Sequence, residues 1–364
     1  MQEPRALRLV APTWVEEGGR RLSYFGGSDY LKMSWHARVR AAGAAAVETM
    51  GLSAGASRMT TGNLEVYKEL EEALRAFLGI RERVVLTSSG YVAPWVAVQA
   101  LAGSHDRVLL DARAHGCLVD AARWTGLPIG RFPHRDADGL RGALAEGAGA
   151  RVLVMTDGLF SQSGEVAPLG AYLEVLPRGA TLLVDDAHGV GVLGRRGRGT
   201  IEWTGVPAGR VVLTGTLSKA LGCYGGWVAG GAGFRRRVLE RSALYTGNTP
   251  MPPVCAAAAL ESLWVLAEEG GVRRERLATN MDRMRGVVSG AGDGPGPMFS
   301  LAPTGGGGAE LGRRLRAAGI LPPRMRYPNG PAPEYFRFAI SSEHSAGQMA
   351  NLREVLDSFH RDRG

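Results

Sequence analysis

The stretch 181-TLLVDDAHGVGVLGRRGRG-199 is followed, after a spacer, by 210-RVVLTGTLSKALGCYGGWVAG-230. Each part opens on an apolar run, Leu182–Val184 or Val211–Leu213, which is typical of a buried parallel strand. Ligands of open α/β sheets bind beyond the carboxyl ends of the strands. We therefore expect one crevice to receive the polar side chains that follow these runs: Asp185, Asp186, His188, Thr214, Thr216, Ser218 and Lys219.

Lysine is scarce in this chain. The only lysines are Lys32, Lys68 and Lys219, and the other 40 of the 43 basic residues are arginine. An amine can lose its proton and attack a carbonyl, whereas a guanidinium cannot. Lys219 could also be an ordinary surface lysine at a helix start, but its polar neighbours favour a chemical role.

Length and composition bound the class of protein. With 364 residues and 45% hydrophobic content, the chain can bury one large core and a smaller satellite domain. No uninterrupted apolar window of about 18 residues appears, so no membrane span is expected. The N-terminus lacks the apolar core of a signal peptide. Three cysteines, without pair or metal spacing, fit a reducing cytoplasm.

The net charge of +8 raises the question of nucleic-acid binding. The arginines, however, are scattered opposite acidic residues rather than gathered in a basic stripe with aromatic residues. We expect no nucleic-acid partner and no metal site. The positive charge instead suits an anionic cofactor or a phosphate-bearing substrate.

Strand-like runs recur with helix-length segments between most of them, which predicts an α/β fold with a mainly parallel seven-stranded sheet and helices on both faces. The seven runs are 83–87, 107–111, 128–132, 152–156, 181–185, 210–215 and 227–230.

We predict three parts along the chain. Residues 1–50 form an N-terminal arm (1–34) and a helix (35–50), and residues 51–250 form the large domain. Residues 251–364 form a linking helix (251–269) and a small C-terminal α+β domain. That domain is expected to hold helices at 309–318 and 346–359 and a strand at 336–340, with the glycine-rich segment 290–308 as a loose connection.

VDDAHGVGVLGRRGRG followed by GTLSKALG resembles the α-oxoamine synthase family of pyridoxal-phosphate (PLP) enzymes, which has fold type I. That family includes 8-amino-7-oxononanoate synthase, 2-amino-3-ketobutyrate CoA ligase, 5-aminolevulinate synthase and serine palmitoyltransferase. The likeness extends from about Tyr24 to the C-terminus. It is specific for the family and much less specific for the substrate.

The resemblance implies roles around the cofactor ring. Lys219 is expected to hold PLP covalently, and Asp185 to keep the ring nitrogen protonated. His188 is expected to reach the ring oxygen and His115 to stack on the ring. Without the motif, Asp185 would be interpreted as a helix cap or an ion pair, and His115 as a structural histidine.

The resemblance also implies groups for the phosphate and the substrates. Helix starts offer free N–H groups to anions, and Ser89, Gly90 and Tyr91 match the family's phosphate-binding turn. Thr216 and Ser218 are expected to add hydroxyls, and Thr249 to reach the phosphate from the neighbouring subunit. Ser161 matches a serine near the ring oxygen. Arg337 matches an arginine that binds the amino-acid carboxylate, for which its fork is well shaped.

Three positions depart from the family pattern. Ser28 stands where the family has an asparagine that helps hold the substrate carboxylate, so amino-acid recognition is expected to differ. Lys32 replaces a glycine of the same motif. Asp186 replaces a glutamate, a change that we expect to be tolerated because that residue has a supporting role. Gly225–Trp227 is closer to the ligase and palmitoyltransferase members, which does not settle the substrate.

The predicted activity is a decarboxylative condensation of a small amino acid with an acyl thioester, carried by CoA or by a carrier protein, to give an α-amino ketone. The chain is expected to be a cytoplasmic homodimer with shared active sites. An aminotransferase of the same fold is the first alternative, because Lys219 and Asp185 would serve both reactions. A non-catalytic partner subunit is the second, and Lys219 argues against it.

Overall fold

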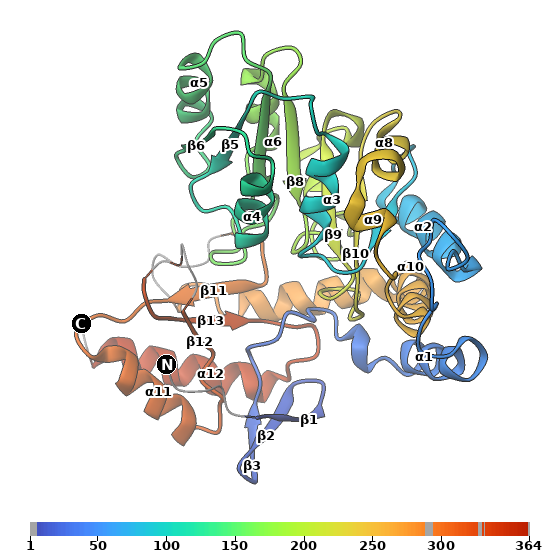
Figure 1. The fold of residues 1–364 in the computed structure, drawn as a ribbon. Helices are drawn as coiled ribbons and strands as arrows, with labels where there is room; N and C mark the ends of the chain where they lie inside the picture. The colour runs from blue at the N-terminus through green and yellow to red at the C-terminus, as the bar shows by residue number, and fades with distance from the viewer. Residues whose placement is uncertain (1–5, 288–293, 327–329, 331, 363–364) are drawn as a thin grey trace.

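A seven-stranded sheet forms the centre of the protein in the computed structural model, which describes residues 6–287, 294–326, 330 and 332–362. Its strand order is β4-β10-β9-β8-β7-β5-β6 (Figure 1). β10 is antiparallel to both neighbours and every other neighbouring pair is parallel. The predicted mainly parallel seven-stranded sheet is confirmed. The strands are β4 (Val85–Thr87), β5 (Arg107–Asp111), β6 (Ile129–Phe132), β7 (Val152–Asp157), β8 (Thr181–Asp185), β9 (Val212–Thr216) and β10 (Gly226–Ala229).

Helices cover both faces of this sheet, as predicted. Alternate strand residues point to opposite faces, so Val108, Leu153 and Leu183 pack in one core and Leu109, Val154 and Leu182 in the other. The first core is covered by α3 (Ala93–Ala100), α4 (Gly116–Trp124) and α8 (Phe234–Arg241), with the short α9 (Ala243–Thr246) beside them. The second is covered by α2 (Glu65–Leu78), α5 (Ala137–Ala145), α6 (Leu169–Val175), α7 (Thr200–Thr204) and α10 (Pro253–Asp282).

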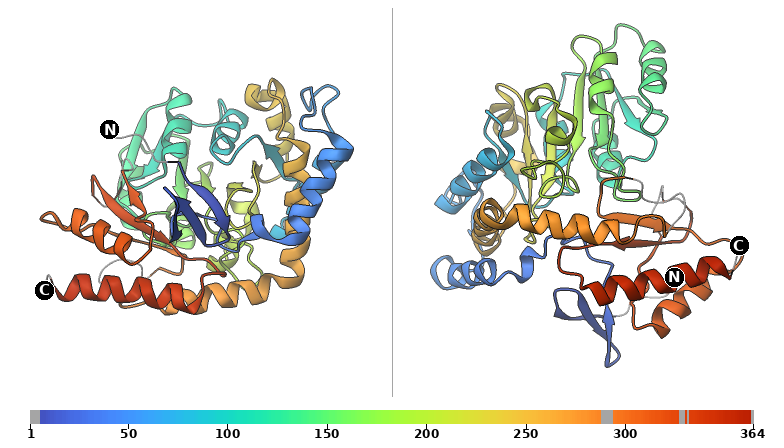
Figure 2. Two further views of the ribbon diagram at one scale, coloured as in Figure 1. Left: turned by 90° about the horizontal axis from the view of Figure 1, so that it is seen from below. Right: turned by 180° about the vertical axis from the view of Figure 1, so that it is seen from behind.

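The linking helix is longer than predicted. α10 has 30 residues and continues to Asp282, whereas the expected helix ended near Glu269. The pair Gly270 and Gly271 suggests a stop in the sequence. Gly270 is nevertheless buried inside the helix, and Leu277 continues the apolar face. Figure 2 shows α10 running from the large sheet to the C-terminal part of the chain.

A second, antiparallel sheet lies in the C-terminal part, with order β11-β13-β12. Its strands are β11 (Met298–Leu301), β12 (Arg324–Met325) and β13 (Tyr335–Ala339), and α11 (Gly307–Ala317) and α12 (Ala346–Arg361) accompany them. The predicted α+β character is confirmed. The predicted loose connection at 290–308 is wrong for residues 298–301, which form β11. This strand pairs with β13, and its Met298 and Phe299 are buried. Residues 290–293 lie outside the described residues.

The predicted N-terminal arm contains a three-stranded antiparallel sheet that the sequence did not reveal: β1 (Arg8–Ala11), β2 (Trp14–Glu17) and β3 (Arg20–Ser23). This sheet lies beside the C-terminal elements (Figure 1). The Ser23 N–H donates to Gly319 O (2.8 Å), and Thr13 Oγ1 donates to Gln348 Oε1 (3.0 Å). A 3-10 turn, η1 (Met33–Trp35), and α1 (Ala37–Met50) follow.

The domain boundaries at 50/51 and 250/251 stay predictions. Within the part of the chain that the structure describes, none of the helices combines the length and the apolar character that a bilayer crossing requires.

Candidate active site

Polar side chains gather where the parallel strands end. β7 ends at Asp157 and β8 at Asp185, which are register partners, and Asp185 is also paired with Thr214 of β9. The carboxyl ends of these strands therefore meet at one edge of the sheet, where open α/β sheets bind ligands. The two predicted strand ends that carry Asp185 and Lys219 are neighbours, as the sequence indicated.

Asp185 is a buried carboxylate with few hydrogen bonds. Its Oδ1 accepts the Ala187 N–H (3.2 Å) and its Oδ2 accepts the Cys117 thiol (3.2 Å). Burial raises its pKa, against the opposing effects of His115, Cys117 and Lys219. Asp185 therefore retains the capacity to accept a proton or a further donor.

Lys219 follows β9 in the turn after Ser218 and is half-buried. Burial lowers the pKa of its amine, Asp185 opposes that effect, and the positive charge of Arg337 adds to it. A lysine with a lowered pKa has more of its amine in the neutral, nucleophilic form.

His188 is buried, and its Nδ1 is 2.7 Å from the Tyr30 hydroxyl. Burial lowers its pKa well below the usual value, and the charges of Lys219 and Arg337 lower it further. The ring is therefore a neutral imidazole that Tyr30 orients.

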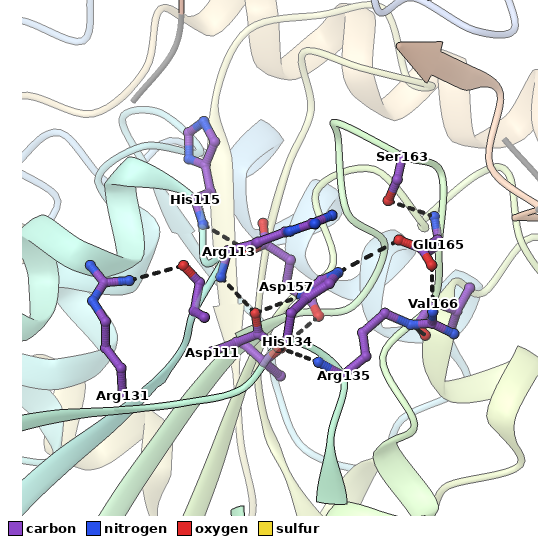
Figure 3. A network of polar contacts seen from close by, with 12 residues as sticks. Asp111, Arg113, His115, Arg131, His134, Arg135, Asp157, Ser163, Glu165 and Val166 are labelled. Atoms are coloured by element: carbon purple, nitrogen blue, oxygen red, sulfur yellow. Dashed lines mark hydrogen bonds and ion pairs between the residues drawn. The ribbon is translucent and has the colours of Figure 1, made fainter. Parts of the chain in front are cut away.

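His115 begins α4 and is held through its backbone. Its N–H donates to Asp157 Oδ2 (2.8 Å), and its Nδ1 is 3.0 Å from Cys117 Sγ. Burial lowers the pKa of this ring as well. Figure 3 shows the ring pointing away from the carboxylate of Asp111. The backbone of His115 is thus fixed by the Asp157 carboxylate of β7, while its ring points away from Asp111.

Hydroxyls and backbone N–H groups meet at the end of β9. Thr216 Oγ1 is 2.8 Å from Ser218 Oγ and donates to Gly225 O (3.0 Å). The turn at Ser89 and Gly90 lies directly against them, because a Cβ added at Gly90 would lie 2.6 Å from Thr216 Cβ. Only glycine permits this approach. The turn and the hydroxyls together form a cradle suited to an anion.

The remaining predicted residues lie at different distances from this centre. Ser161 is buried in the loop after β7, and the Tyr91 ring lies edge-on to His115 with centroids 6.3 Å apart. Arg337 is on β13, and its charge acts on Lys219, His188 and Tyr30.

Thr249 and Ser28 are the remaining predicted residues. Thr249 is exposed and lines a small cavity of about 20 Å³ with Thr87, Ser88 and Arg58. Ser28 is half-buried, two residues before Tyr30. The structure therefore leaves the roles of Thr249 and Ser28 as predictions.

Asp186 supports the loop after β8. Its Oδ2 accepts the Thr200 N–H (2.7 Å) and its Oδ1 accepts the Thr200 hydroxyl (2.5 Å). A Cβ added at Gly189 or Gly199 would lie 2.1 Å from its carboxylate. The shorter aspartate in place of glutamate thus fits a tightly packed loop.

Sequence reasoning assigned no role to Tyr30, Cys117 or Asp157, which contact His188, Asp185 and His115. Asp157 had a usable signal, because it ends an apolar run as Asp185 does. Cys117 and Tyr30 had none, since their partners are 68 and 158 positions away in the chain.

A second polar cluster lies at the same edge, around Asp111 at the end of β5. We call Asp111, Arg113, His134, Arg135 and Glu165 the Asp111 cluster (Figure 3). The Asp111 carboxylate accepts Arg113 N–H (2.8 Å), His134 Nδ1–H (2.8 Å), Arg135 N–H (3.0 Å) and, more distantly, the Tyr172 hydroxyl (3.5 Å). Arg135 then pairs with Glu165 (2.5 Å).

The active-site residues fit a planar, phosphate-bearing aldehyde with a basic ring nitrogen. Lys219 supplies an amine for the aldehyde and Asp185 an under-bonded carboxylate for the nitrogen. The Gly90 turn, Thr216 and Ser218 supply an anion cradle.

Comparison with known proteins agrees with this chemistry. Residues 24–356 match the family model described as aminotransferase class I and II. The 8-amino-7-oxononanoate synthase of Methylococcus capsulatus is 40% identical, over 98% of this chain and 92% of that protein. The enzyme of the same name from Nitrosococcus oceani is 38% identical, over 94% of this chain and 92% of that protein.

Solved structures resemble the whole fold. Serine palmitoyltransferase from S. paucimobilis, whose structure carries bound PLP and myriocin, has a TM-score of 0.90 and 28% identity, over 98% of this chain and 92% of that one. An 8-amino-7-oxononanoate synthase from Francisella tularensis has a TM-score of 0.79 over 93% of this chain and 98% of that one. At 23% identity, this second likeness concerns the fold alone.

Proposed function

Since the chain belongs to the class I and II aminotransferase family and, within it, to the α-oxoamine synthases, we propose that it condenses an amino acid with an acyl thioester and releases CO₂. The single observation that carries this proposal is the pair of Asp185 and Lys219 at adjoining strand ends, each with its pKa displaced by burial.

The cofactor is PLP, which supplies an aldehyde for an amine and a ring that withdraws electrons. Asp185 faces the ring nitrogen. The Ser89–Tyr91 turn, Thr216 and Ser218 bind the phosphate, and Thr249 of a partner subunit joins them. His188 and Ser161 bind the ring oxygen, and His115 lies against the ring face.

The chain's own groups also handle the substrates. Arg337 binds the amino-acid carboxylate with its two-pronged guanidinium. The Lys219 amine, neutral for part of the time because burial lowers its pKa, removes the proton from the amino acid's α-carbon and later returns one. Ser28, in place of the family's asparagine, leaves the carboxylate more dependent on Arg337.

The relatives' name suggests the substrates. An 8-amino-7-oxononanoate is a nine-carbon acid with a ketone and a neighbouring amine near its far end. Dividing it between these two groups gives an alanine that has lost its carboxylate and a seven-carbon acyl group that ends in a second carboxylate. We propose alanine and the monothioester of a seven-carbon dicarboxylic acid as the substrates. The curated relatives reported above are synthases, which favours condensation over transamination.

We also propose that the enzyme is a cytoplasmic homodimer. The position of Thr249 supports the dimer, since it is exposed and lines a cavity with Thr87 and Ser88, next to the proposed phosphate-binding turn. Size measurement at micromolar concentration, coupled to an activity assay, tests it. A fully active monomer contradicts shared active sites.

Reduction and mapping test the chemistry. Borohydride treatment of the holoenzyme should fix PLP on Lys219, identified by peptide mass spectrometry, and not on Lys32 or Lys68. In a separate assay, untreated holoenzyme supplied with alanine and the acyl-CoA should release free thiol and CO₂ in equal amounts. Formation of pyridoxamine phosphate and a keto acid instead identifies an aminotransferase.

A further inference from the structure

Lys32 is a buried cation in an unusual backbone conformation. The residue is only 5% exposed, and its φ of 52° places it in the left-handed region. Side chains other than glycine, asparagine and aspartate are uncommon there. A lysine at this position has an unfavourable backbone conformation and an unfavourable solvent environment at once, so its side chain calls for a specific explanation.

Among the described residues, no carboxylate oxygen lies within 4.0 Å of the Lys32 ammonium, which instead lies over the Tyr24 ring. Asp29 and Glu343 are the carboxylates whose charge acts on it. Asp29 is already bonded to Met33 N–H (3.0 Å), Ser34 N–H (3.1 Å) and Ser34 Oγ (2.6 Å). Glu343 faces two arginines, Arg273 (3.5 Å) and Arg276 (3.6 Å).

A largely buried lysine without a carboxylate partner is costly, and proteins pair such charges or use them to bind ligands. Burial lowers the pKa of Lys32, and Asp29 and Glu343 only oppose that effect. An anionic group of a ligand would supply the missing partner.

The segment that carries Lys32 borders the active site. Tyr30, two residues earlier, is bonded to His188 (2.7 Å). The Lys32 Nζ lies 6.0 Å from the centre of the Tyr24 ring, and the charge of Arg337 acts on the hydroxyl of the same tyrosine. Two cations, Lys32 and Arg337, thus approach Tyr24 from residues that are far apart in the chain.

This segment is fixed to the strand end after Arg337. The Ala339 N–H donates to Phe25 O (2.7 Å), and the Ser342 N–H donates to Tyr30 O (2.8 Å). The relative position of the two segments that carry these cations is therefore set by backbone hydrogen bonds.

We propose that the Lys32 ammonium binds the distal carboxylate of the acyl donor and so selects a dicarboxylic monothioester over a plain fatty acyl thioester. This inference rests on the proposed function, in which the two substrates bring two carboxylates to one site. The fork of Arg337 suits the amino-acid carboxylate, which must be held in one orientation. Lys32 offers a compact point charge, which suits the flexible end of an acyl chain.

The test compares two donors on the holoenzyme: the CoA monothioester of heptanedioic acid and heptanoyl-CoA, which differ only in the distal carboxylate. Lys32→Met keeps the length of the side chain without its charge, and Lys32→Gly suits the positive φ. Both variants should lower kcat/KM for the carboxylated donor by about thirtyfold, the low end for losing a buried charge pair. Neither should change kcat/KM for heptanoyl-CoA. Lys68→Met, at an exposed lysine, is the control.

Two further variants distinguish binding of the acyl donor's distal carboxylate from binding of the alanine carboxylate. Lys32→Arg should keep most of the preference for the carboxylated donor. Arg337→Ala should weaken alanine binding, followed by the change in cofactor absorption, by roughly thirtyfold or more. Lys32→Met should leave alanine binding unchanged. An effect of Lys32→Met on alanine, and none on the donors, would assign Lys32 to the amino acid and overturn the proposal.

A binding measurement keeps the test independent of turnover. Calorimetry of the two CoA thioesters with the holoenzyme, in the absence of alanine, should show a preference for the carboxylated donor that Lys32→Met and Lys32→Gly abolish. If no thioester reacts, the proposed function fails while this titration still decides the role of Lys32. Equal binding of the carboxylated donor by the wild type and by a folded variant overturns the inference.

Discussion

Asp111 and Asp185 end two strands of the same sheet at the same edge, and both are buried, with 0% and 5% exposure. Their surroundings differ. Asp111 accepts three N–H donors within 3.0 Å and a more distant hydroxyl, whereas Asp185 accepts one backbone N–H and one thiol, both at 3.2 Å. One carboxylate is saturated with donors and the other is not.

Burial alone therefore does not mark a functional carboxylate. Asp111 uses its hydrogen bonds to hold the loops that carry Arg113 and Arg135. Asp185 remains under-bonded beside Lys219, and burial raises its pKa. A buried acid that lacks donors is complementary to a ligand that brings one, such as a protonated ring nitrogen.

Lys219→Ala should cause the largest loss of turnover, since it removes the covalent and proton-transferring group beside the under-bonded Asp185. Turnover should fall by about four orders of magnitude or more. The matched change in the Asp111 cluster, His134→Ala, should lower the melting temperature. It should leave the turnover of the folded enzyme within about twofold of the wild-type value. A similar loss of turnover in both variants would mean that the Asp111 cluster and the site around Asp185 do not differ in their importance for catalysis.

Asp185→Asn tests the under-bonded carboxylate itself. We expect turnover to fall by about a hundredfold or more, because a preorganised charge opposite the cofactor is lost. The melting temperature of the apoprotein should stay the same or rise, since the variant removes a poorly compensated buried charge. Steady-state kinetics and thermal unfolding measure the two effects. A strong loss of apoprotein stability would show that Asp185 is structural.

Asp111→Asn should give the opposite result. The NH₂ of the new amide group would face N–H donors, so hydrogen bonds that Asp111 accepts would be lost. The free energy of unfolding should therefore fall by about 3 kcal/mol. Turnover per folded molecule should change little. Denaturant titration measures the loss, and an unchanged midpoint would mean that the four donors contribute nothing.

Asp186 is an intermediate case with two donors, both from Thr200. Burial raises its pKa to about 7, and the two bonds from Thr200 only oppose that effect. Because the unfolded value is about 4, the folded protein holds more protons than the unfolded chain between these pH values, so this group's contribution lowers stability as pH rises.

The wild type should therefore lose about 2 kcal/mol more stability than Asp186→Asn between pH 5 and pH 7. Chemical unfolding of both proteins at the two pH values measures this difference. Parallel pH profiles would show that Asp186 titrates alike in the folded and unfolded states.

The sequence predicted the sheet because its apolar runs are short, regular and buried on both faces. It missed β11, whose four residues lie among glycines, and β1–β3, whose burial depends on elements at the other end of the chain. The motif around Lys219 identified the chemistry of the site.

The motif did not distinguish the two carboxylates. LLD at Asp111 and LVD at Asp185 are nearly identical patterns. The donors that saturate Asp111 come from His134, Arg135 and Tyr172, which only the folded chain brings near.

The contact between Thr13 and Gln348 joins residues 335 positions apart. At about 5–20 residues per second, the ribosome adds Gln348 roughly 20–70 s after it adds Thr13. Throughout that time the β1–β3 sheet and the segment that carries Tyr30 and Lys32 lack their C-terminal contacts. The nascent chain therefore completes the part of the proposed substrate site that carries Tyr30 and Lys32 last, after the cofactor-binding strands have left the ribosome. A chain truncated before α12 is an incomplete enzyme that exposes the apolar surfaces which α12 covers.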